Sequence, residues 1–504
     1  MTSKIPQEIH DLVPDELRDD YGIYWSSRSN RYYVFRDIGY VYDPKIKRSR
    51  VQRQPLGSIK DGAFTYSPSW LSKQTIKKLS EQNNRLQRQT TKRKAPAMKA
   101  DAPALETQKA AETLKTAICD IEDPRQQKKT QYPLSAILMV ALLASFTGDT
   151  SAVSIAIYWR MHAAELAQII DDFPAEVPSH DTINRVLRLI DKARMTTTLN
   201  RLATPLAVEA SNRLLHIDGQ AVRASKTEDS DKGRYIFNVY DSSNMLVVTH
   251  RLINEKENEI SSSIELLSDM ALRAGDIVTA DALNTQKKLV DFLQDHNVDY
   301  CLAVKENHPK LHSEMRHLFG VTDDSRFRLA EDIDCGHGRI ETRRIAVLPA
   351  SLLSKSFLEA WPGLSEGCII RATNVCEKKS RRARESTETR YFISSLSYET
   401  EDIAARAGTV IRRHWHVENS CHWHLDCQFD QDRIQCTNEN YLTNRVALNK
   451  IGLNALKTAQ RTFAARQQKY SIKTLQKLCS SPAGALETLA MVLDIHNLVE
   501  ESKS

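Results

Sequence analysis

The chain has 504 residues, of which 41% are hydrophobic and 27% are charged, so it can form about three domains of ordinary size. Its nine cysteines show no paired spacing, which argues against a disulfide-stapled secreted scaffold and favours reduced thiols in the cytoplasm. The formal net charge of +6, from 70 Lys and Arg against 64 Asp and Glu, is only a mild basic excess.

No segment of the sequence is expected to enter a membrane. The longest apolar run, residues 134–146, is well short of the roughly twenty residues that cross a bilayer. Residues 1–16 lack a basic start followed by an apolar run, so we expect no signal peptide. The run 134–146 is instead expected to be a buried core helix.

Residues 1–70 are expected to form a small β-containing unit. Residues 31–42 are mostly aromatic or β-branched, with Asp37 and Gly39 near the middle. This composition predicts two short strands joined by a turn.

A basic stretch follows. Residues 44–99 contain 15 Lys or Arg and two acids, and residues 71–103 are poor in large apolar side chains. This imbalance favours a polyanion partner, because each neutralised phosphate releases counterions. A solvated linker or exposed helix at 71–103 explains the composition equally well.

Residues 104–205 have apolar positions that recur every three or four residues, which predicts a compact helical domain. Within it, Ser179 is a good N-cap for a helix with one apolar side. Arg185 and Arg188 would then point outward, so the helix could enter a major groove as a recognition helix. An ordinary amphipathic surface helix is the alternative.

From residue 206 onward, strand-like runs are followed by alternating strands and helices. This pattern predicts an α/β domain with a mixed sheet flanked by helices at residues 206–465. A strand-rich insert is expected at about residues 327–396, and a helical C-terminal tail at 466–504.

Two acids follow strand-like runs in this domain. Asp218 precedes Gly219 after one run, and Asp281 ends another, so both are expected where a strand gives way to a turn. Carboxylates at the ends of strands in one sheet can come close together, and oxygen-rich sites select Mg²⁺ or Mn²⁺. A strand-end Asp can also simply cap a turn.

Glu418 is the candidate for a third acid. If this segment forms an α-helix, His414, Glu418 and His422 lie four residues apart on one face of it. The segment also offers a zinc alternative, although its ligands lack the fixed spacing of zinc sites. The zinc-capable residues are His414, His416, Cys421, His422, His424 and Cys427.

Over about residues 120–457 the chain resembles the H-repeat-associated transposases of bacterial insertion sequences, which belong to the DDE group with an RNase H-like core. Each matching string is weak alone, but their order is specific. The strings are YPLSAILMVALLA, VPSHDTINRVLRLID, HIDGQAVRAS, VTADALNTQ, DYCLAVKENH, HGRIETRRI, YFISSL and IRRHWHVENSCHWHLD.

The resemblance implies that Asp218, Asp281 and Glu418 are catalytic acids that hold two Mg²⁺ or Mn²⁺ ions. It implies metal-dependent cleavage and strand transfer of double-stranded DNA, at element ends and target, by a homo-oligomer that acts on chromosomal DNA. The helical domain at 104–205 would be the domain associated with these transposases. Candidate DNA contacts are Lys305, Arg339, Arg343, Arg412 and Arg413, beside Arg185 and Arg188 in that helical domain. An ordinary surface charge explains Lys305, Arg339 and Arg343 equally well.

The chain also departs from the family. Gln220 stands where the family usually has Lys, Ala224 where it has Gly, and residues 306–308 where it has Gly-Asn-Gln. Of the Tyr, Arg, Glu and Lys that more distant DDE relatives carry around the glutamate, only the glutamate is kept, which puts DNA contacts by that helix in doubt. The positions are Ile411, His414, Glu418 and Leu425.

Two other functions fit the same residues. One is an RNase H-like nuclease, or a repurposed element protein, that nicks DNA without strand transfer. The other is a non-enzymatic DNA-binding protein, a decayed copy that has lost catalysis. The presence of all three acids favours catalysis over decay.

Overall fold

In the computed structural model the chain forms two compact units, Met1–Ala102 and Pro103–Ser504. The expected basic linker at residues 71–103 lies outside the residues that the structure describes. These are residues 5–18, 21–26, 30–43, 48–66, 105–126, 128, 130–170, 173–174, 176–207, 212–226, 233–253, 259–336, 339–378, 384–436, 438–465 and 467–501.

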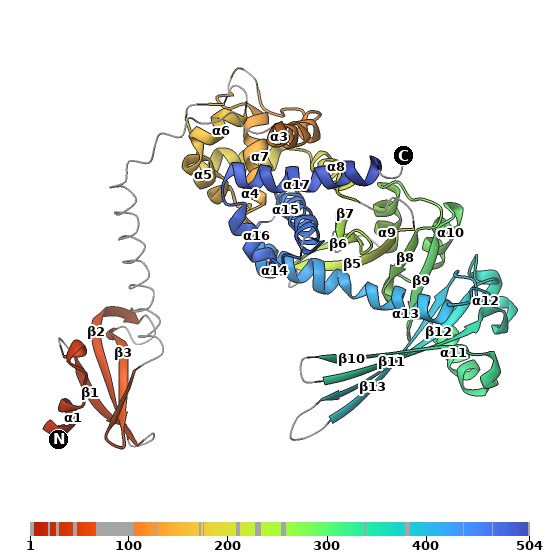
Figure 1. Cartoon of the computed structure of the whole chain (residues 1–504), viewed down its shortest axis with the longest axis horizontal. Coiled ribbons are helices and arrows are strands. Elements are labelled where there is room, and N and C mark those ends of the chain that lie inside the picture. The colour runs from red at the N-terminus through yellow and green to blue at the C-terminus, as the bar shows by residue number, and fades with distance from the viewer. Residues whose placement is uncertain are drawn as a thin grey trace. The chain divides into compact units, whose positions relative to one another are not determined.

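The first unit contains a four-stranded antiparallel sheet with the strand order β1-β2-β3-β4 (Figure 1). Val34, Leu56 and Ile59 of the sheet pack against Val13 and Leu17, and all five side chains are buried. The elements are α1 (Gln7–Asp11), η1 (Asp15–Leu17), β1 (Gly22–Ser26), β2 (Arg31–Asp43), β3 (Arg48–Lys60) and β4 (Ala63–Tyr66).

The prediction of two short strands within residues 31–42 was wrong, because these residues form the single strand β2. The register between β2 and β3 shifts between Asp37 and Gly39. Asp and Gly therefore mark an irregularity of the ladder here, since such residues are tolerated at bulges as well as in turns.

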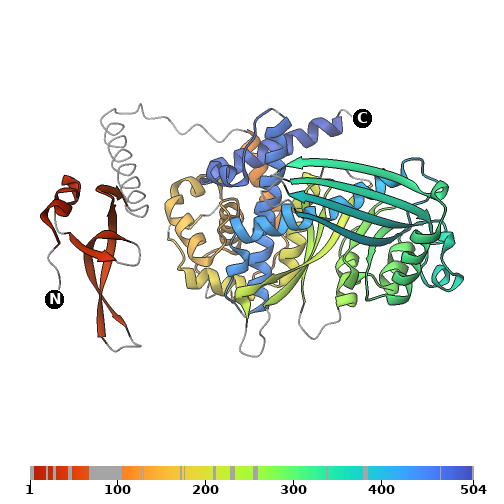
Figure 2. The same cartoon turned by 90° about the horizontal axis from the view of Figure 1, so that it is seen from below.

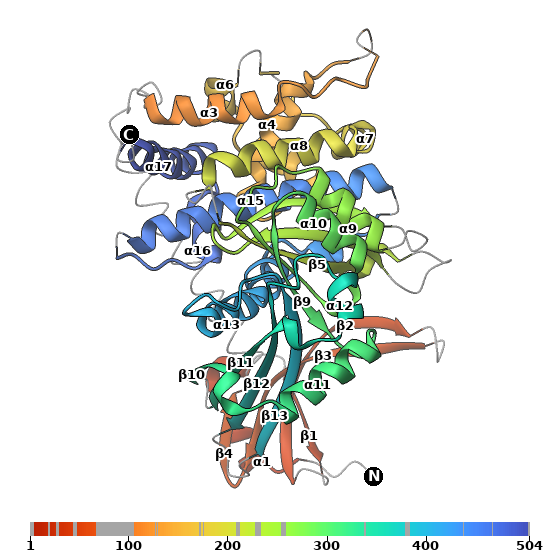
Figure 3. The ribbon, with the colours of Figure 1, turned by 90° about the vertical axis from the view of Figure 1, so that its right-hand side faces the viewer.

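The second unit begins with a helical part in which α4 is buried along almost its whole length, as expected for the apolar run at 134–146. Helices from the C-terminal end of the chain complete the same core: α15 packs against α4, α7, α8 and α17 (Figure 3). The helices are α3 (Leu105–Ile118), α4 (Leu134–Ser145), α5 (Ala152–Met161), α6 (Ala163–Ile169), α7 (His180–Leu189), α8 (Lys192–Ala203), α15 (Glu439–Ala465), α16 (Ile472–Leu478) and α17 (Pro482–Glu501).

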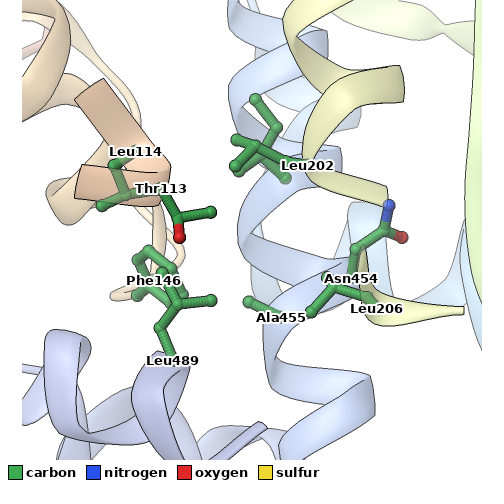
Figure 4. Close-up of a pocket in the computed structure, with 9 residues that line it drawn as sticks. Thr113, Leu114, Phe146, Leu202, Leu206, Asn454, Ala455 and Leu489 are labelled. Carbon is green, nitrogen blue, oxygen red and sulfur yellow. The ribbon is translucent and has the colours of Figure 1, made fainter. Parts of the chain in front are cut away.

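A gap of about 10 Å³ remains between these helices, lined mainly by apolar side chains such as Leu114, Phe146 and Leu489 (Figure 4). This volume holds at most about one water molecule. The gap is therefore a packing defect of the helical core and offers no room for a ligand.

The rest of the second unit is built on a mixed nine-stranded sheet with the order β10-β11-β12-β13-β9-β8-β5-β6-β7. Strand β8 runs parallel to both β5 and β9, and all other pairs are antiparallel. The strands between residues 328 and 394 extend this same sheet (Figure 2). The strands are β5 (Leu214–Val222), β6 (Arg234–Asp241), β7 (Leu246–Ile253), β8 (Ile277–Ala280), β9 (Asp299–Val304), β10 (Arg328–Gly336), β11 (Arg339–Pro349), β12 (Cys368–Lys378) and β13 (Arg384–Ser394).

Different helices cover the two faces of this sheet. One core joins the sheet to α9 (Glu259–Ser268), α10 (Lys287–Asp295) and α11 (Pro309–Val321), and a second core joins it to α13 (Ile403–His414). No helix among the described residues is long and apolar enough to cross a membrane.

Candidate active site

The two aspartates lie on neighbouring parallel strands. Strands β5 and β8 pair as far as Ile217 opposite Ala280, so Asp218 and Asp281 each follow the last paired position of their strand. Because side chains alternate along a strand, both fall on the face that α13 covers. The expectation that Asp218 ends its strand was wrong: β5 continues to Val222, since it goes on pairing with β6 after the ladder with β8 has ended.

A buried polar cluster below the two acids joins β5, β8 and the end of α13. The Nδ1 atom of His216 lies 2.6 Å from Thr279 Oγ1, and its Nε2 atom lies 2.7 Å from Ser242 Oγ. The same Thr279 hydroxyl lies 2.8 Å from His414 Nδ1. Burial keeps the pKa of His216 well below its usual range, so these contacts are made by a neutral ring.

Glu418 lies beyond α13 in a π-helical turn, η8 (Val417–His422), which leads into α14 (Trp423–Gln428). The expected regular α-helix with His414, Glu418 and His422 at equal steps is therefore interrupted. Within η8, the side chain of His422 is buried and that of Glu418 is exposed to solvent. A π-helical turn widens the helix locally and is frequent at functional sites.

The three acids share one electrostatic environment. Burial, opposed by the Gly219 backbone N–H and aided by the negative charges of Asp281 and Glu418, raises the pKa of Asp218 to about 7. In the described part of the chain, however, no three His, Cys, Asp or Glu side chains are close enough together to hold a metal ion. The same finding leaves the zinc alternative without support.

Asp281 also caps a turn. Its Oδ1 atom accepts hydrogen bonds from the Asn284 backbone N–H at 3.2 Å and from Asn284 Nδ2 at 2.8 Å. These bonds begin η5 (Ala282–Asn284) and fix the position of the Asp281 carboxylate. Both hydrogen bonds are accepted by Oδ1, so Asp281 can cap the turn and still use Oδ2 to bind another group.

A chain of buried polar contacts leads from Lys450 to Asp218. His422 Nδ1 lies 3.5 Å from Asp218 Oδ2, Asn238 Nδ2 donates to His422 Nε2 at 3.0 Å, and Lys450 Nζ donates to Asn238 Oδ1 at 2.5 Å. Since an amide nitrogen only donates, His422 accepts at Nε2 and its proton must sit on Nδ1, toward Asp218.

Sequence reasoning missed Asn238 and Lys450. Both are completely buried, although a lysine is almost never fully buried without a partner. Lys450 lies on α15 between Asn449 and Ile451, and its local sequence gives no signal of burial.

Asp426 is part of a neighbouring network. Gln220 Nε2 donates to Asp426 Oδ1 at 2.7 Å, and Gln431 Nε2 donates to Gln220 Oε1 at 2.9 Å. Burial raises the pKa of Asp426 to about 6. Gln220, where the resembling family usually has Lys, therefore ties Asp426 to the strand that carries Asp218.

The candidate DNA-contacting residues have different surroundings. Lys305 is exposed and lines a cavity of about 70 Å³ together with Asp281 and Trp415. Arg343 and Arg412 both form ion pairs with Asp332 and Asp334, and Arg343 also pairs with Glu341.

The remaining candidates differ in exposure. Arg413 is exposed, and Arg339 is the first residue of β11. On α7, Ser179 caps the helix through Thr182 N, as expected, and Arg185 and Arg188 are exposed.

Comparison with known proteins identifies related sequences. Residues 115–203 match the family model described as DDE_Tnp_1-associated, and residues 169–454 match the one described as Transposase DDE domain. The chain is 29% identical over 353 residues to YhhI of Escherichia coli (strain K12), covering 68% of this chain and 90% of YhhI. It is 29% identical over 340 residues to YncI of Escherichia coli O157:H7, covering 67% and 85%. The name of YhhI proposes an H repeat-associated transposase, and that of YncI a transposase.

Proposed function

Because this chain belongs to the transposase DDE domain family, we propose that it is the DNA transposase of an insertion sequence, which cleaves DNA strands and transfers the freed ends to a target. The observation that carries this proposal is the placement of Asp218 and Asp281 on adjacent parallel strands, with Glu418 near enough to raise the pKa of Asp218.

Three carboxylates in one electrostatic environment fit divalent cations. Their mutual repulsion favours a cation among them, and oxygen ligands of this kind select Mg²⁺ or Mn²⁺. In this proposal Asp218, Asp281 and Glu418 would hold two ions. The ions would supply activation of water or a DNA 3′-OH and stabilisation of the leaving oxygen.

The other residues of the site position the acids. The Nδ1 atom of His422 faces Asp218 Oδ2 at 3.5 Å and would help to orient that carboxylate, and the hydrogen bonds from Asn284 would do the same for Asp281. The exposed Lys305 lines the same cavity as Asp281, and its amine would contact a phosphate of the bound strand.

The strand order also supports an RNase H-like core. Strands β7, β6 and β5 form an antiparallel series, and β8 and β9 continue it in parallel, with helices on both faces. Domains would then follow the expected layout, with the helical domain at 104–205 binding DNA and the insert at about 327–396 widening the catalytic sheet.

Double-stranded DNA would be the partner, bound by a homo-oligomer at the element ends and the target. It would act on chromosomal DNA in the cytoplasm, a reducing compartment with which nine free cysteines are compatible.

The test uses a labelled duplex that carries the preferred site, identified by binding selection from random DNA. We expect Mg²⁺- or Mn²⁺-dependent cleavage that Asp218→Asn and Asp281→Asn abolish, while DNA binding and folding are retained, because an amide keeps the shape but not the charge. Joining of a labelled 3′-OH end to a plasmid separates a transposase from a nuclease. Full activity in excess chelator would overturn the proposal.

A further inference from the structure

The sheet of the first unit has an aromatic face that its hydrophobic core does not use. On β2, Val34 is buried in the core, so Tyr33 and Phe35 project to the opposite side. Tyr24 of β1 lies directly opposite Tyr33 in the antiparallel register. Arg53 of β3 reaches the same side, because its guanidinium lies 4.3 Å from the centre of the Phe35 ring.

These four side chains, Tyr24, Tyr33, Phe35 and Arg53, form what we term the aromatic face. The Tyr24 and Tyr33 rings are stacked with their centres 5.4 Å apart, and Tyr24 also contacts Phe35 at 5.8 Å. Tyr24 is 46% exposed, and the four residues line an open groove of about 240 Å³. The aromatic face is therefore a preformed surface of flat rings that is open to solvent.

The sequence that contains β2, β3 and β4 is basic, which favours a polyanion partner. Residues 30–66 carry eight Lys or Arg and three acids. Asp37 accepts from Arg53 Nε at 3.2 Å, and the guanidinium has four further N–H donors with which it can bind a phosphate. Flat rings beside basic side chains are the combination with which proteins bind single-stranded nucleic acid, since bases stack on the rings and phosphates pair with the cations.

We propose that the aromatic face binds single-stranded DNA, or the unpaired end of a duplex, by stacking bases on Tyr24 and Tyr33. A base within a closed duplex already has neighbours on both of its faces, so it cannot lie flat on these rings. This site goes beyond the proposed cleavage site, and it would hold a melted or processed DNA strand.

The test measures binding of the full chain to an oligonucleotide that contains 2-aminopurine, whose fluorescence falls when the base stacks. For the wild-type chain we expect fluorescence quenching when the single strand binds and no further quenching when the matching duplex binds. Tyr24→Ala and Tyr33→Ala should each weaken single-strand binding by about 5- to 100-fold and reduce the quenching. Tyr24→Phe, which keeps the ring, should retain both.

The matched control is Trp25→Ala. Trp25 is also 46% exposed, but it lies opposite Tyr32 on the other side of β1 and packs on that ring at 4.6 Å. It should leave the quenching unchanged. No quenching of the single strand by the wild type would overturn the proposal, as would equal losses in Tyr24→Phe and Tyr24→Ala. Because binding is measured without cleavage, failure of the proposed catalysis would not affect this result.

Discussion

Lys450 is completely buried in the interior of the second unit. Its Nζ atom donates to the neutral side-chain amide of Asn238. Burial lowers its pKa to about 7. The unfolded chain holds this proton up to about pH 10.4, so between pH 7 and 10 the unfolded state binds more protons than the folded state. The free energy of unfolding therefore rises with pH through this group.

Lys450→Met should remove that dependence. We expect the difference in unfolding free energy, wild type minus variant, to increase by about 1 kcal/mol per pH unit between pH 7.5 and 9.5. Urea unfolding at three pH values measures it. The exposed Lys287 of α10 is the control, and Lys287→Met should give no such trend. A pH-independent difference for Lys450→Met would show that the lysine is not buried as described.

Glu418 and Asp426 can be separated by substitution. Glu418 contributes to the raised pKa of Asp218, whereas Asp426 is bound by Gln220. We expect Glu418→Gln to abolish cleavage with folding and DNA binding retained, and Asp426→Asn to reduce cleavage much less. Metal-dependent cleavage of labelled DNA measures both variants. Cleavage that survives Glu418→Gln and is lost in Asp426→Asn would assign the third ligand to Asp426.

At the scale of elements, α7 combines a buried and an exposed side. Ile183, Val186 and Leu187 are buried, so the helix is anchored whatever its outer side chains are. Arg185→Ala and Arg188→Ala should each weaken binding to the selected DNA site by about tenfold, because they remove groove contacts without disturbing the core. Fluorescence anisotropy measures this, with the exposed Arg160→Ala on α5 as the control. Equal, small effects of all three would identify α7 as an ordinary surface helix.

The N-terminal cap of α7 has its own effect on stability. Ser179 Oγ accepts from the Thr182 backbone N–H at 3.2 Å, so Ser179→Ala leaves that donor without its partner. We expect a loss of about 1 kcal/mol in the free energy of unfolding, measured by urea unfolding. Ser179→Asp should restore most of it, because its carboxylate can also cap; no loss in the alanine variant would contradict the cap.

At the scale of the whole molecule, the first unit and the basic stretch should contribute non-specific DNA affinity. Residues 44–99 contain 15 Lys or Arg. Without residues 1–102, the plot of log K against log salt concentration should become less steep by about 3 or more, since fewer phosphates are neutralised. Titrations at several salt concentrations measure it, and an unchanged slope would identify the stretch as a linker.

Much of the architecture follows from local patterns. Alternation of strand and helix predicted a mixed α/β sheet, Ser179 predicted the start of α7, and the apolar run at 134–146 predicted the buried α4. These succeed because capping, burial and side-chain alternation depend on residues a few positions apart. The catalytic role of the three acids stays a prediction.

The failures occur where a distant partner decides the structure. Asp218 lies within β5 because β6 keeps pairing beyond it, and residues 31–42 stay one strand because β3 runs alongside them. The π-helical turn at Val417–His422 could not be read from a pattern that suits an α-helix.

By itself the sequence determined the family and the α/β class, and it singled out the three acids as candidates, since these rest on motif order and on local periodicity. Only the tertiary structure decided how the acids are supported, because Lys450 meets Asn238 across 212 residues and Asn238 meets His422 across 184. It also decided that Tyr24, Tyr33, Phe35 and Arg53 share one face of a sheet. Such contacts arise when the chain packs, because burial and strand register bring together residues whose local sequences carry no mutual signal.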